Sequence, residues 1–313
     1  MNRLIEYMLP PARNSAAGET DALFAFINIT SFILLAGITV AIIYFAWKYR
    51  RKSDDDVTPV ITHNNKLEIT WSVIPLILVM IVFGWGFTGY MNLATAPDDA
   101  YEIRVVGKSW LWEFHYENGT TSVNEMNVPV DRPVKLVMSS DDVIHSFFVP
   151  DFRVKRDVLP NRYSTLWFEA TEVGESIIFC TEYCGTQHSN MDAVVNIMPQ
   201  VEFDEWLEAG DTVDEDMPAD ERGEALVSRN GCTACHSADG SSGVGPSFSG
   251  LWDSERNFED GESTTADENY IRESILEPNA KIVEGYDGVM PSYQGVVDDQ
   301  QIDDIIEYIK TLD

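Results

Sequence analysis

The chain has 313 residues, with 52 acidic and 21 basic side chains and a net charge of −31. Its hydrophobic content of 44% is enough for folded cores and excludes global disorder. The negative charge argues against binding to nucleic acid and against a helix lying on anionic lipid, because both need clusters of Lys and Arg. Four cysteines, at positions 180, 184, 232 and 235, are too few for a disulfide scaffold and form two close pairs.

Two uncharged apolar runs near the N-terminus predict a transmembrane hairpin, with helices over about residues 22–47 and 69–93. Pro75 and several glycines interrupt the second run, which membrane helices tolerate. Two buried helices of a soluble protein are the alternative, but the aromatic residues near the ends of the second run fit a bilayer better. The connecting loop begins KYRRK at 48–52, and the positive-inside bias places it in the cytoplasm. We therefore expect a membrane segment over 1–95 and an extracytoplasmic remainder.

Between residues 96 and 200 the sequence changes to short alternating segments separated by Gly, Pro, Asn and Asp. This pattern is typical of an all-β domain, either an antiparallel β-sandwich or a small barrel. The expected strands are 101–106, 134–139, 143–149, 163–169, 176–179 and 193–198.

The composition changes again after residue 200. An acidic stretch over 201–218 predicts a linker, and 219–313 predicts a small all-α domain around a Gly/Ser-rich middle. The expected helices are 219–229, 267–276 and 298–312. From residue 201 onward there are 29 acidic and 6 basic side chains, so −23 of the net charge of −31 lies here.

The cysteine pair in the C-terminal domain belongs to a C-x-x-C-H motif, the attachment signature of a c-type haem. Cys232 and Cys235 are spaced to reach the two vinyl groups of one haem, and His236 follows as the proximal iron ligand. A redox dithiol needs a βαβ unit and a zinc ribbon needs a second C-x-x-C, and the sequence has neither. Met290, in a polar loop between two expected helices, is the expected sixth ligand. The turn at 245–246 is expected near the proximal side.

The other cysteine pair lies among soft ligands at the end of an expected strand. Cys180, Cys184, His188 and Met191 fall within 12 residues, and sulfur with imidazole suits copper. A mononuclear blue-copper site needs one Cys and two His, so the extra Cys favours two metals bridged by thiolates. Such a site needs a second imidazole from elsewhere, for which His145 is the first candidate.

Alternatives to this copper site remain. His115 is a second candidate for the missing imidazole, whereas His63 is on the cytoplasmic side and is excluded by topology. A disulfide between the two cysteines is permitted in an oxidising compartment but leaves the neighbouring His and Met unexplained. A tetrahedral zinc site with two Cys and two His is a further alternative.

With these motifs in place, the chain resembles subunit II of haem–copper cytochrome c oxidases, in the bacterial form with a fused cytochrome c domain. The motifs that carry the resemblance are C-x-E-x-C-G-x-x-H-x-x-M at 180–191, D-V-x-H-S-x-x-V-P at 142–150 and C-x-x-C-H at 232–236. The resemblance covers nearly the whole chain. It implies a two-helix membrane hairpin, a cupredoxin-like β-domain with a dinuclear copper centre (CuA), and a cytochrome c domain with covalent haem c.

The resemblance also implies roles for individual residues. It implies that Cys180 and Cys184 are bridging thiolates. It also implies that His145 and Met191 bind one copper, and that His188 and the backbone carbonyl of Glu182 bind the other. The Glu182 carboxylate resembles the family's ligand for magnesium or manganese at the contact with the catalytic subunit.

Two further positions resemble functional residues of the family. Trp110 holds the place of the tryptophan through which electrons enter, although a half-buried strand aromatic is the simpler interpretation. Glu68 resembles the glutamate at the mouth of a proton channel, although it can also simply reach water.

Asn161 replaces a Gly that is usual in the family, and Asn tolerates the left-handed backbone conformation that Gly supplies. Ser109 replaces a usual Gln and leaves one local hydrogen bond unassigned.

Together these features predict the electron-entry subunit of a proton-pumping terminal oxidase in the bacterial inner membrane. The expected partners are the catalytic subunit I, subunit III and a soluble donor such as cytochrome c, with no nucleic acid. The alternatives are an electron-transfer protein for another reductase, a quinol oxidase subunit and a copper-binding assembly protein. The acidic surface either steers a basic donor or is an adaptation to high salt, and the sequence leaves both open.

Overall fold

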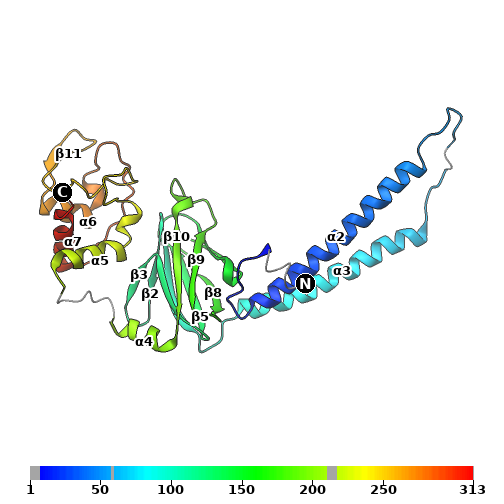
Figure 1. The fold of residues 1–313 in the computed structure, drawn as a ribbon, viewed down its shortest axis with the longest axis horizontal. Helices are drawn as coiled ribbons and strands as arrows, with labels where there is room; N and C mark the ends of the chain where they lie inside the picture. The colour runs from blue at the N-terminus through cyan, green and yellow to red at the C-terminus, as the bar shows by residue number, and fades with distance from the viewer. Residues whose placement is uncertain (1–7, 58–59, 210–216, 313) are drawn as a thin grey trace.

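The computed structural model describes residues 8–57, 60–209 and 217–312. Figure 1 shows three parts in chain order, namely a helical hairpin, a β-sandwich and a small helical domain. This order agrees with the expected fold class, and the β-sandwich lies between the other two parts.

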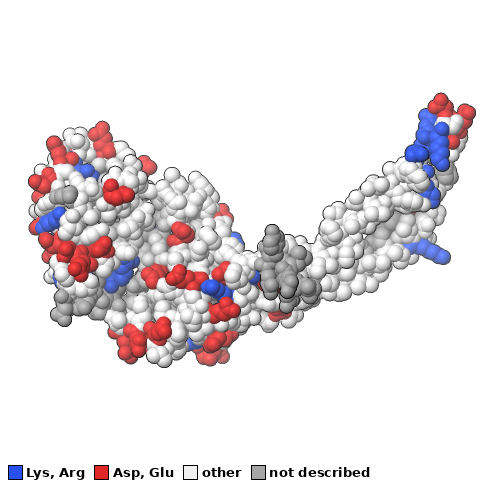
Figure 2. All heavy atoms as spheres, in the orientation of Figure 1, with Lys and Arg blue, Asp and Glu red and all other residues white. Residues whose placement is uncertain are grey.

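The hairpin consists of α2 (Ala17–Lys48) and α3 (Asn65–Ala94), and both helices are long and apolar enough to cross a membrane. Each extends beyond the expected apolar run, because polar residues outside the run continue the first and last turns. Asn64 caps α3, since its side chain accepts a hydrogen bond from the backbone N–H of Leu67. Figure 2 shows almost no charged residues along the hairpin, whereas basic and acidic residues gather at its far end.

The β-sandwich has two five-stranded sheets, ordered β3-β2-β1-β5-β8 and β4-β10-β9-β6-β7. The strand bounds are β1 Tyr101–Lys108, β2 Leu111–His115, β3 Thr121–Val123, β4 Glu125–Pro129, β5 Pro133–Ser140, β6 His145–Val149, β7 Val154–Val158, β8 Ser164–Glu169, β9 Gly174–Cys180 and β10 Asp192–Met198. Most neighbouring strands are antiparallel, but β1 pairs with β5, and β4 with β10, in parallel. Aromatic side chains fill the space between the sheets, among them Trp112, Phe114, Phe147 and Phe168.

The start of α2 is attached to the end of the β-sandwich. Asn14 forms a β-bridge with Ala170, and its side chain donates to the carbonyl of Phe152 at 2.9 Å. Arg153 forms a two-pronged ion pair with Asp21, with contacts of 2.8 and 3.0 Å, and both side chains are about nine-tenths buried. The guanidinium also donates to three proline carbonyls, so the hairpin and the sandwich share one hydrogen-bonded joint.

Replacement of Asp21 by Ala is expected to weaken this joint. The substitution leaves the Arg153 guanidinium nearly buried without its counter-charge, which costs about 3 kcal/mol. We expect a lower thermal midpoint in detergent and faster proteolysis near the joint. Glu19→Ala, on an exposed position of the same helix, is the matched control. Equal behaviour of the two variants would show that the ion pair contributes nothing to stability.

The expected linker at 201–218 begins with a helix instead. Helix α4 (Gln200–Ala209) buries Phe203 against Tyr101, with ring centroids 5.3 Å apart, so the apolar side chains of this acidic stretch hold it on the β-sandwich. Residues 210–216 of the expected linker lie outside the described part of the chain.

The C-terminal domain contains the three expected helices, α5 (Ala219–Arg229), α6 (Glu268–Leu276) and α7 (Asp299–Lys310). Asp267 and Asp298 cap α6 and α7 through hydrogen bonds from backbone N–H groups. A small hairpin of β11 (Glu255–Asn257) and β12 (Ser263–Thr265) was not expected from the sequence. Short 3₁₀ helices complete the fold: η1 Pro150–Phe152, η2 His188–Asn190, η3 Cys232–Ala234 and η4 Pro278–Ala280.

Gly223 allows α5 and α7 to cross closely. A Cβ at this position would lie 2.0 Å from the backbone oxygen of Asp304 and 2.7 Å from Cβ of Tyr308. Gly223→Ala is therefore expected to destabilise the C-terminal domain by about 3 kcal/mol, because rigid helix backbone must move. Ser228→Ala, at an exposed position of α5, is the control, and thermal unfolding followed by circular dichroism measures both. An unchanged midpoint for Gly223→Ala would contradict the close crossing.

Candidate metal and haem sites

Strand pairing brings the two halves of the cysteine site in the β-sandwich together. β6 begins at His145 and β9 ends at Cys180, and these strands are neighbours through the pair Phe147↔Cys180. After β9 the chain forms a loop that contains Cys184 and η2 and returns as β10. A rigid sheet therefore positions one histidine and one cysteine, and the loop supplies the remaining ligand candidates.

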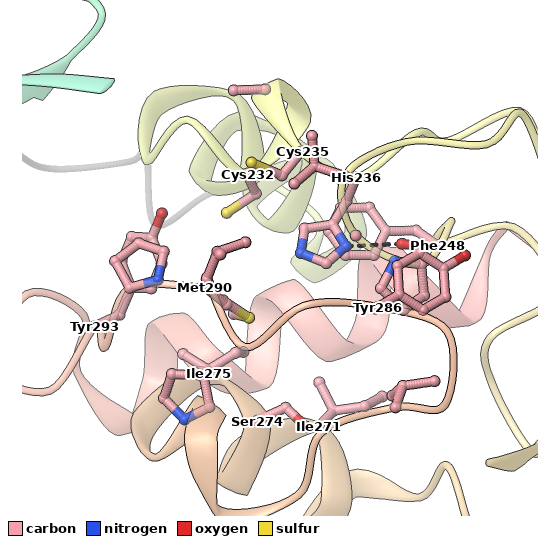
Figure 3. A pocket seen from close by; sticks show the side chains of 18 of the residues that line it. Cys232, Cys235, His236, Phe248, Ile271, Ser274, Ile275, Tyr286, Met290 and Tyr293 are labelled. Carbon is pink, nitrogen blue, oxygen red and sulfur yellow. Dashed lines mark hydrogen bonds between the residues drawn. The ribbon is translucent and has the colours of Figure 1, made fainter. Parts of the chain in front are cut away.

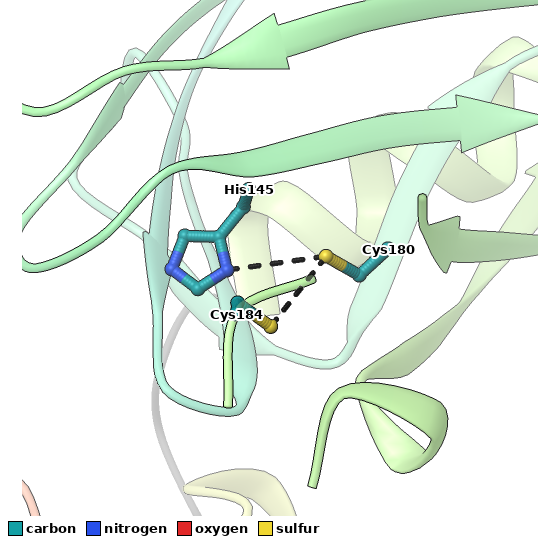
Figure 4. Close-up of side chains that lie close together, drawn as sticks. All are labelled: His145, Cys180 and Cys184. Carbon is teal, nitrogen blue, oxygen red and sulfur yellow. Dashed lines mark hydrogen bonds between the residues drawn. The ribbon is translucent and has the colours of Figure 1, made fainter. Parts of the chain in front are cut away.

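Six potential ligand atoms meet at this point. Cys180 and Cys184 are free cysteines with their sulfurs 3.8 Å apart, so the disulfide alternative is not formed. Figure 4 shows His145 pointing toward the two thiols. The contacts are His145 Nδ1 to Cys180 Sγ at 3.9 Å, Cys180 Sγ to the carbonyl of Glu182 at 3.3 Å, Cys184 Sγ to His188 Nδ1 at 3.5 Å, and Cys184 Sγ to Met191 Sδ at 3.7 Å.

The donor set fits two copper ions better than a hard cation. Two thiols, two imidazoles and a thioether are soft or borderline ligands, which select copper or zinc over magnesium or calcium. Each thiol has a different imidazole beside it, as a pair of bridged metals requires. His145 is fully buried, and the cysteines and Met191 are buried as well, whereas His188 is partly exposed.

Burial and hydrogen bonding act in opposite directions on the two thiols. Burial disfavours the thiolate of Cys180, but the contacts with His145 and with backbone groups lower the pKa of this thiol below that of a free cysteine. Burial and the charge on Cys180 raise the pKa of Cys184. Since metals bind thiolates, metal binding must displace a proton from Cys184 at neutral pH.

A carboxylate supports the buried histidine. Burial opposes ionisation of Asp142, yet hydrogen bonds from His145 and Ser109 hold the pKa of this carboxyl well below its usual range. Asp142 belongs to the sequence motif at 142–150, but the motif alone predicts no role for it. The signal was an acidic residue three positions before a histidine at the start of a strand.

Trp110 lies between this cluster and the C-terminal domain. Its Nε1–H donates to the backbone carbonyl of Cys184 at 3.1 Å. Gly185, with φ +120°, lies so close that a Cβ there would be 3.0 Å from the indole. Together with Ser109 and Leu111, Trp110 also lines the large cavity of the C-terminal domain.

That cavity has an empty volume of about 1380 Å³ including its open mouth, and the C-x-x-C-H motif lines it. The motif lies on η3, which follows α5 directly. His236 Nδ1–H donates to the carbonyl of Pro246 at 2.7 Å, which leaves Nε2 free to bind iron. The His236 ring stacks on Phe248, and a Cβ on Gly245 would lie 2.5 Å from the ring. The turn at 245–246 therefore lies against His236, as expected.

Met290, the candidate for the second iron ligand, and the charged side chain of Arg256 also line the cavity. Figure 3 shows the thiols of Cys232 and Cys235, the His236 ring and the Met290 sulfur converging on one space. Arg256 also lines the cavity, and its buried Nε has no hydrogen-bond partner among the described residues. An apolar cavity with a guanidinium in its wall fits a haem, whose propionates are carboxylates. No sequence pattern indicated a role for Arg256.

Three family models match consecutive parts of the chain. They are the transmembrane domain of cytochrome c oxidase subunit II over residues 4–87, its periplasmic domain over 120–198, and cytochrome c over 221–313. A cytochrome c oxidase subunit 2 from Alkalihalophilus pseudofirmus is 32% identical over 300 residues, with 91% of this chain and 85% of the relative covered. The chain belongs to the cytochrome c oxidase subunit 2 family.

A second curated relative supports this membership, and the chain is also similar to a solved structure. A cytochrome c oxidase subunit 2 from Synechocystis is 30% identical over 253 residues, which cover 64% of this chain and 75% of the relative. The crystal structure of the periplasmic domain of subunit II from Bradyrhizobium japonicum is 30% identical, with a TM-score of 0.36 over 37% of this chain and 96% of that domain.

Membership in the subunit II family has direct consequences for this chain. It is a membrane-anchored protein with a periplasmic domain, it belongs to an oxidoreductase complex, and it has a fused cytochrome c domain. The subunit II domain implies CuA copper, and the cytochrome c domain implies haem. The residues described above fit both groups.

Other candidate residues lie away from the two sites. His115 is 37% exposed and contacts Glu113, so the structure places His145 and not His115 at the cysteines. His63 lies in the loop at the far end of the hairpin. Asn161 has φ +56°, which confirms the left-handed conformation predicted for this substitution. Glu68 accepts a hydrogen bond from the backbone N–H of Asn64 and so helps to cap α3.

Proposed function

We propose that this chain is the electron-entry subunit of a proton-pumping terminal cytochrome c oxidase in the bacterial inner membrane. It passes electrons from a soluble donor, such as cytochrome c, through covalent haem c and CuA to catalytic subunit I, which reduces O₂ to water. One observation carries the proposal. Trp110 lines the cavity of the cytochrome c domain and is hydrogen-bonded to Cys184 of the copper-ligand cluster.

Six groups of the β-domain hold the copper pair in this proposal. Cys180 and Cys184 would supply thiolates to both metals. His145 and Met191 would hold one copper, and His188 and the backbone carbonyl of Glu182 would hold the other. Such a pair exchanges single electrons when it is bound. The sheet holds the ligand positions fixed, which keeps the reorganisation on electron exchange small.

Four residues of the C-terminal domain hold the haem. Cys232 and Cys235 would attach it covalently, and His236 and Met290 would supply the ligands of its iron. Pro246 fixes the tautomer of His236 by accepting its Nδ1–H. Ligation by Met and His raises the haem potential relative to ligation without Met, which suits a group that receives electrons from a soluble donor.

Contacts with other subunits involve exposed groups of this chain. The Glu182 side chain is exposed while its carbonyl faces Cys180, so the carboxylate is free to bind magnesium at the contact with subunit I. The apolar surfaces of α2 and α3 are exposed in the isolated chain and fit the membrane helices of subunit I, with subunit III as a further partner. In this proposal Glu68, in the first turn of α3, lies at the mouth of a proton channel.

Replacement of Trp110 by Phe tests the proposal. In the purified oxidase, the donor is expected to reduce the haem at the normal rate, while oxygen consumption loses most of its rate. Trp167→Phe is the control, because Trp167, on β8, also makes one indole-to-carbonyl hydrogen bond, to Asn92 near the end of α3 at 3.2 Å. Normal oxygen consumption by Trp110→Phe would contradict electron entry at Trp110. Absence of a mixed-valence copper spectrum in the unaltered protein would contradict the function as a whole.

A further inference from the structure

Asp142 lies between the buried histidine of the copper cluster and the segment that carries Trp110. Its Oδ1 accepts a hydrogen bond from Nε2–H of His145 at 2.8 Å, and its Oδ2 accepts one from the backbone N–H of Ser109 at 2.7 Å. Each carboxylate oxygen therefore serves a different partner. Because Ser109 directly precedes Trp110, the Asp142 side chain joins His145 to the segment that contains Trp110.

In addition to this hydrogen bond, close packing holds the His145 ring in place. A Cβ on Gly107 would lie 3.0 Å from Cδ2 of the ring, and Trp112 meets the ring edge-on with centroids 5.9 Å apart. With Nε2 bound to Asp142, Nδ1 carries the free lone pair and faces Cys180 Sγ at 3.9 Å. The carboxylate thus selects both the tautomer and the ring angle that a metal ligand requires.

Trp110 is connected to the cluster at two points. Its side chain donates to the carbonyl of Cys184 at 3.1 Å, and its ring lies against Gly185. Its backbone is connected through Ser109 and Asp142 to His145. The two connections end on different ligand residues, one in the loop after β9 and one on β6.

The surroundings of Asp142 show that it is not part of a surface ion pair. Its Oδ1 also accepts the backbone N–H of Val143 at 2.6 Å, so the side chain is fixed against its own turn. The nearby cation, Lys108, contacts Glu113 at 2.7 Å and Asp141 at 3.6 Å. The Asp142 carboxylate is therefore committed to the turn, to Ser109 and to His145.

We propose that Asp142 is a positioning residue that holds His145 and the Trp110 segment as one rigid unit. The proposal rests on the proposed function, in which His145 binds copper and Trp110 admits electrons. It adds that the Asp142 carboxylate connects the entry point to one of the metal ligands. Ser109 takes part through its backbone, so the replacement of the family's Gln by Ser at this position does not break the connection.

Asp142→Asn in the full chain, within its oxidase complex, tests this role. Asn offers one acceptor oxygen and one NH₂ group, so it satisfies Ser109 or His145 but not both donors. We expect an altered electron paramagnetic resonance spectrum of the copper pair. We also expect about a tenfold shift in the electron equilibrium between haem and copper, which is about 59 mV for a one-electron couple. Hydrogen exchange of the peptide that contains Ser109 is expected to accelerate with or without copper.

Asp141→Asn is the matched control. It removes the same charge one position earlier, from a side chain that is 60% exposed and contacts Lys108. This variant is expected to keep the spectrum, the equilibrium and the exchange rate of the unaltered protein. If Asp141→Asn and Asp142→Asn behave alike, the effect is one of net charge and the proposal is overturned.

Asp142→Glu distinguishes the effect of the position of the carboxylate from the effect of its charge. It also tests the proposal if Asp142→Asn does not assemble into the oxidase complex. It keeps the charge but lengthens the side chain by one methylene, so the two acceptor oxygens no longer lie where Ser109 and His145 meet them. We expect a changed copper spectrum and faster exchange at Ser109. Behaviour like the unaltered protein would overturn the positioning role. A missing paired-copper spectrum in the unaltered protein itself would instead contradict the proposed function.

Discussion

His145→Asn is expected to abolish the mixed-valence copper spectrum and to reduce oxygen consumption by the oxidase to background. The substitution removes the only imidazole next to Cys180 among the described residues and leaves a space that no other donor fills. The haem should still become reduced by the donor, because its ligands lie in another domain. Optical spectra, metal analysis and oxygen uptake measure these three outcomes.

His115→Asn is the matched control for this prediction. Both histidines lie on strands of the β-domain, but His115 is partly exposed on β2 and contacts Glu113. Its replacement should leave copper content and oxygen uptake unchanged. Loss of copper from His115→Asn, or its retention in His145→Asn, would mean that the histidine at the cysteines has been assigned wrongly.

Met290→Leu is expected to produce the second largest effect. Leucine keeps the apolar contact in the cavity but has no sulfur, so the haem iron loses its sixth ligand. Because Met ligation raises haem potential, the potential of the variant should fall and its electrons should equilibrate differently with copper. Potentiometric titration of the haem absorbance measures the change, and covalent attachment should persist because Cys232 and Cys235 are intact.

Met198→Leu provides the control for the haem prediction. Met198 ends β10 and packs at the edge of the β-domain core, away from the cavity. Its haem potential should equal that of the unaltered protein. If Met290→Leu has the same haem potential as this control, another group must be the sixth ligand.

Elements with a single buried face were predictable from the sequence. β5 and β10 alternate between buried and less buried residues along their length, and their expected bounds were close to the observed ones. β2 was not among the expected strands, because four of its five residues are buried and no alternation is left. Leu111 of β2 lines the cavity of the C-terminal domain, so a neighbouring domain covers the face that would otherwise be polar.

The residues of the metal site also divide into those that the sequence alone indicated and those that only the fold identified. Cys180, Cys184, His188 and Met191 lie within one short segment, so their spacing revealed them. The choice of His145 depended on a pairing between β6 and β9 that local sequence does not specify. The roles of Asp142 and Arg256 come from contacts or unpaired atoms that only the folded chain shows.

The joint between the hairpin and the β-sandwich has a consequence for biogenesis. Backbone groups of residues 13–15 bond to residues 151, 169 and 171, so a segment that precedes α2 is joined to a part of the chain that is made after both membrane helices. The ribosome finishes both membrane helices between the synthesis of these two parts. The segment before α2 must therefore be on the same side of the membrane as the β-sandwich when these bonds form.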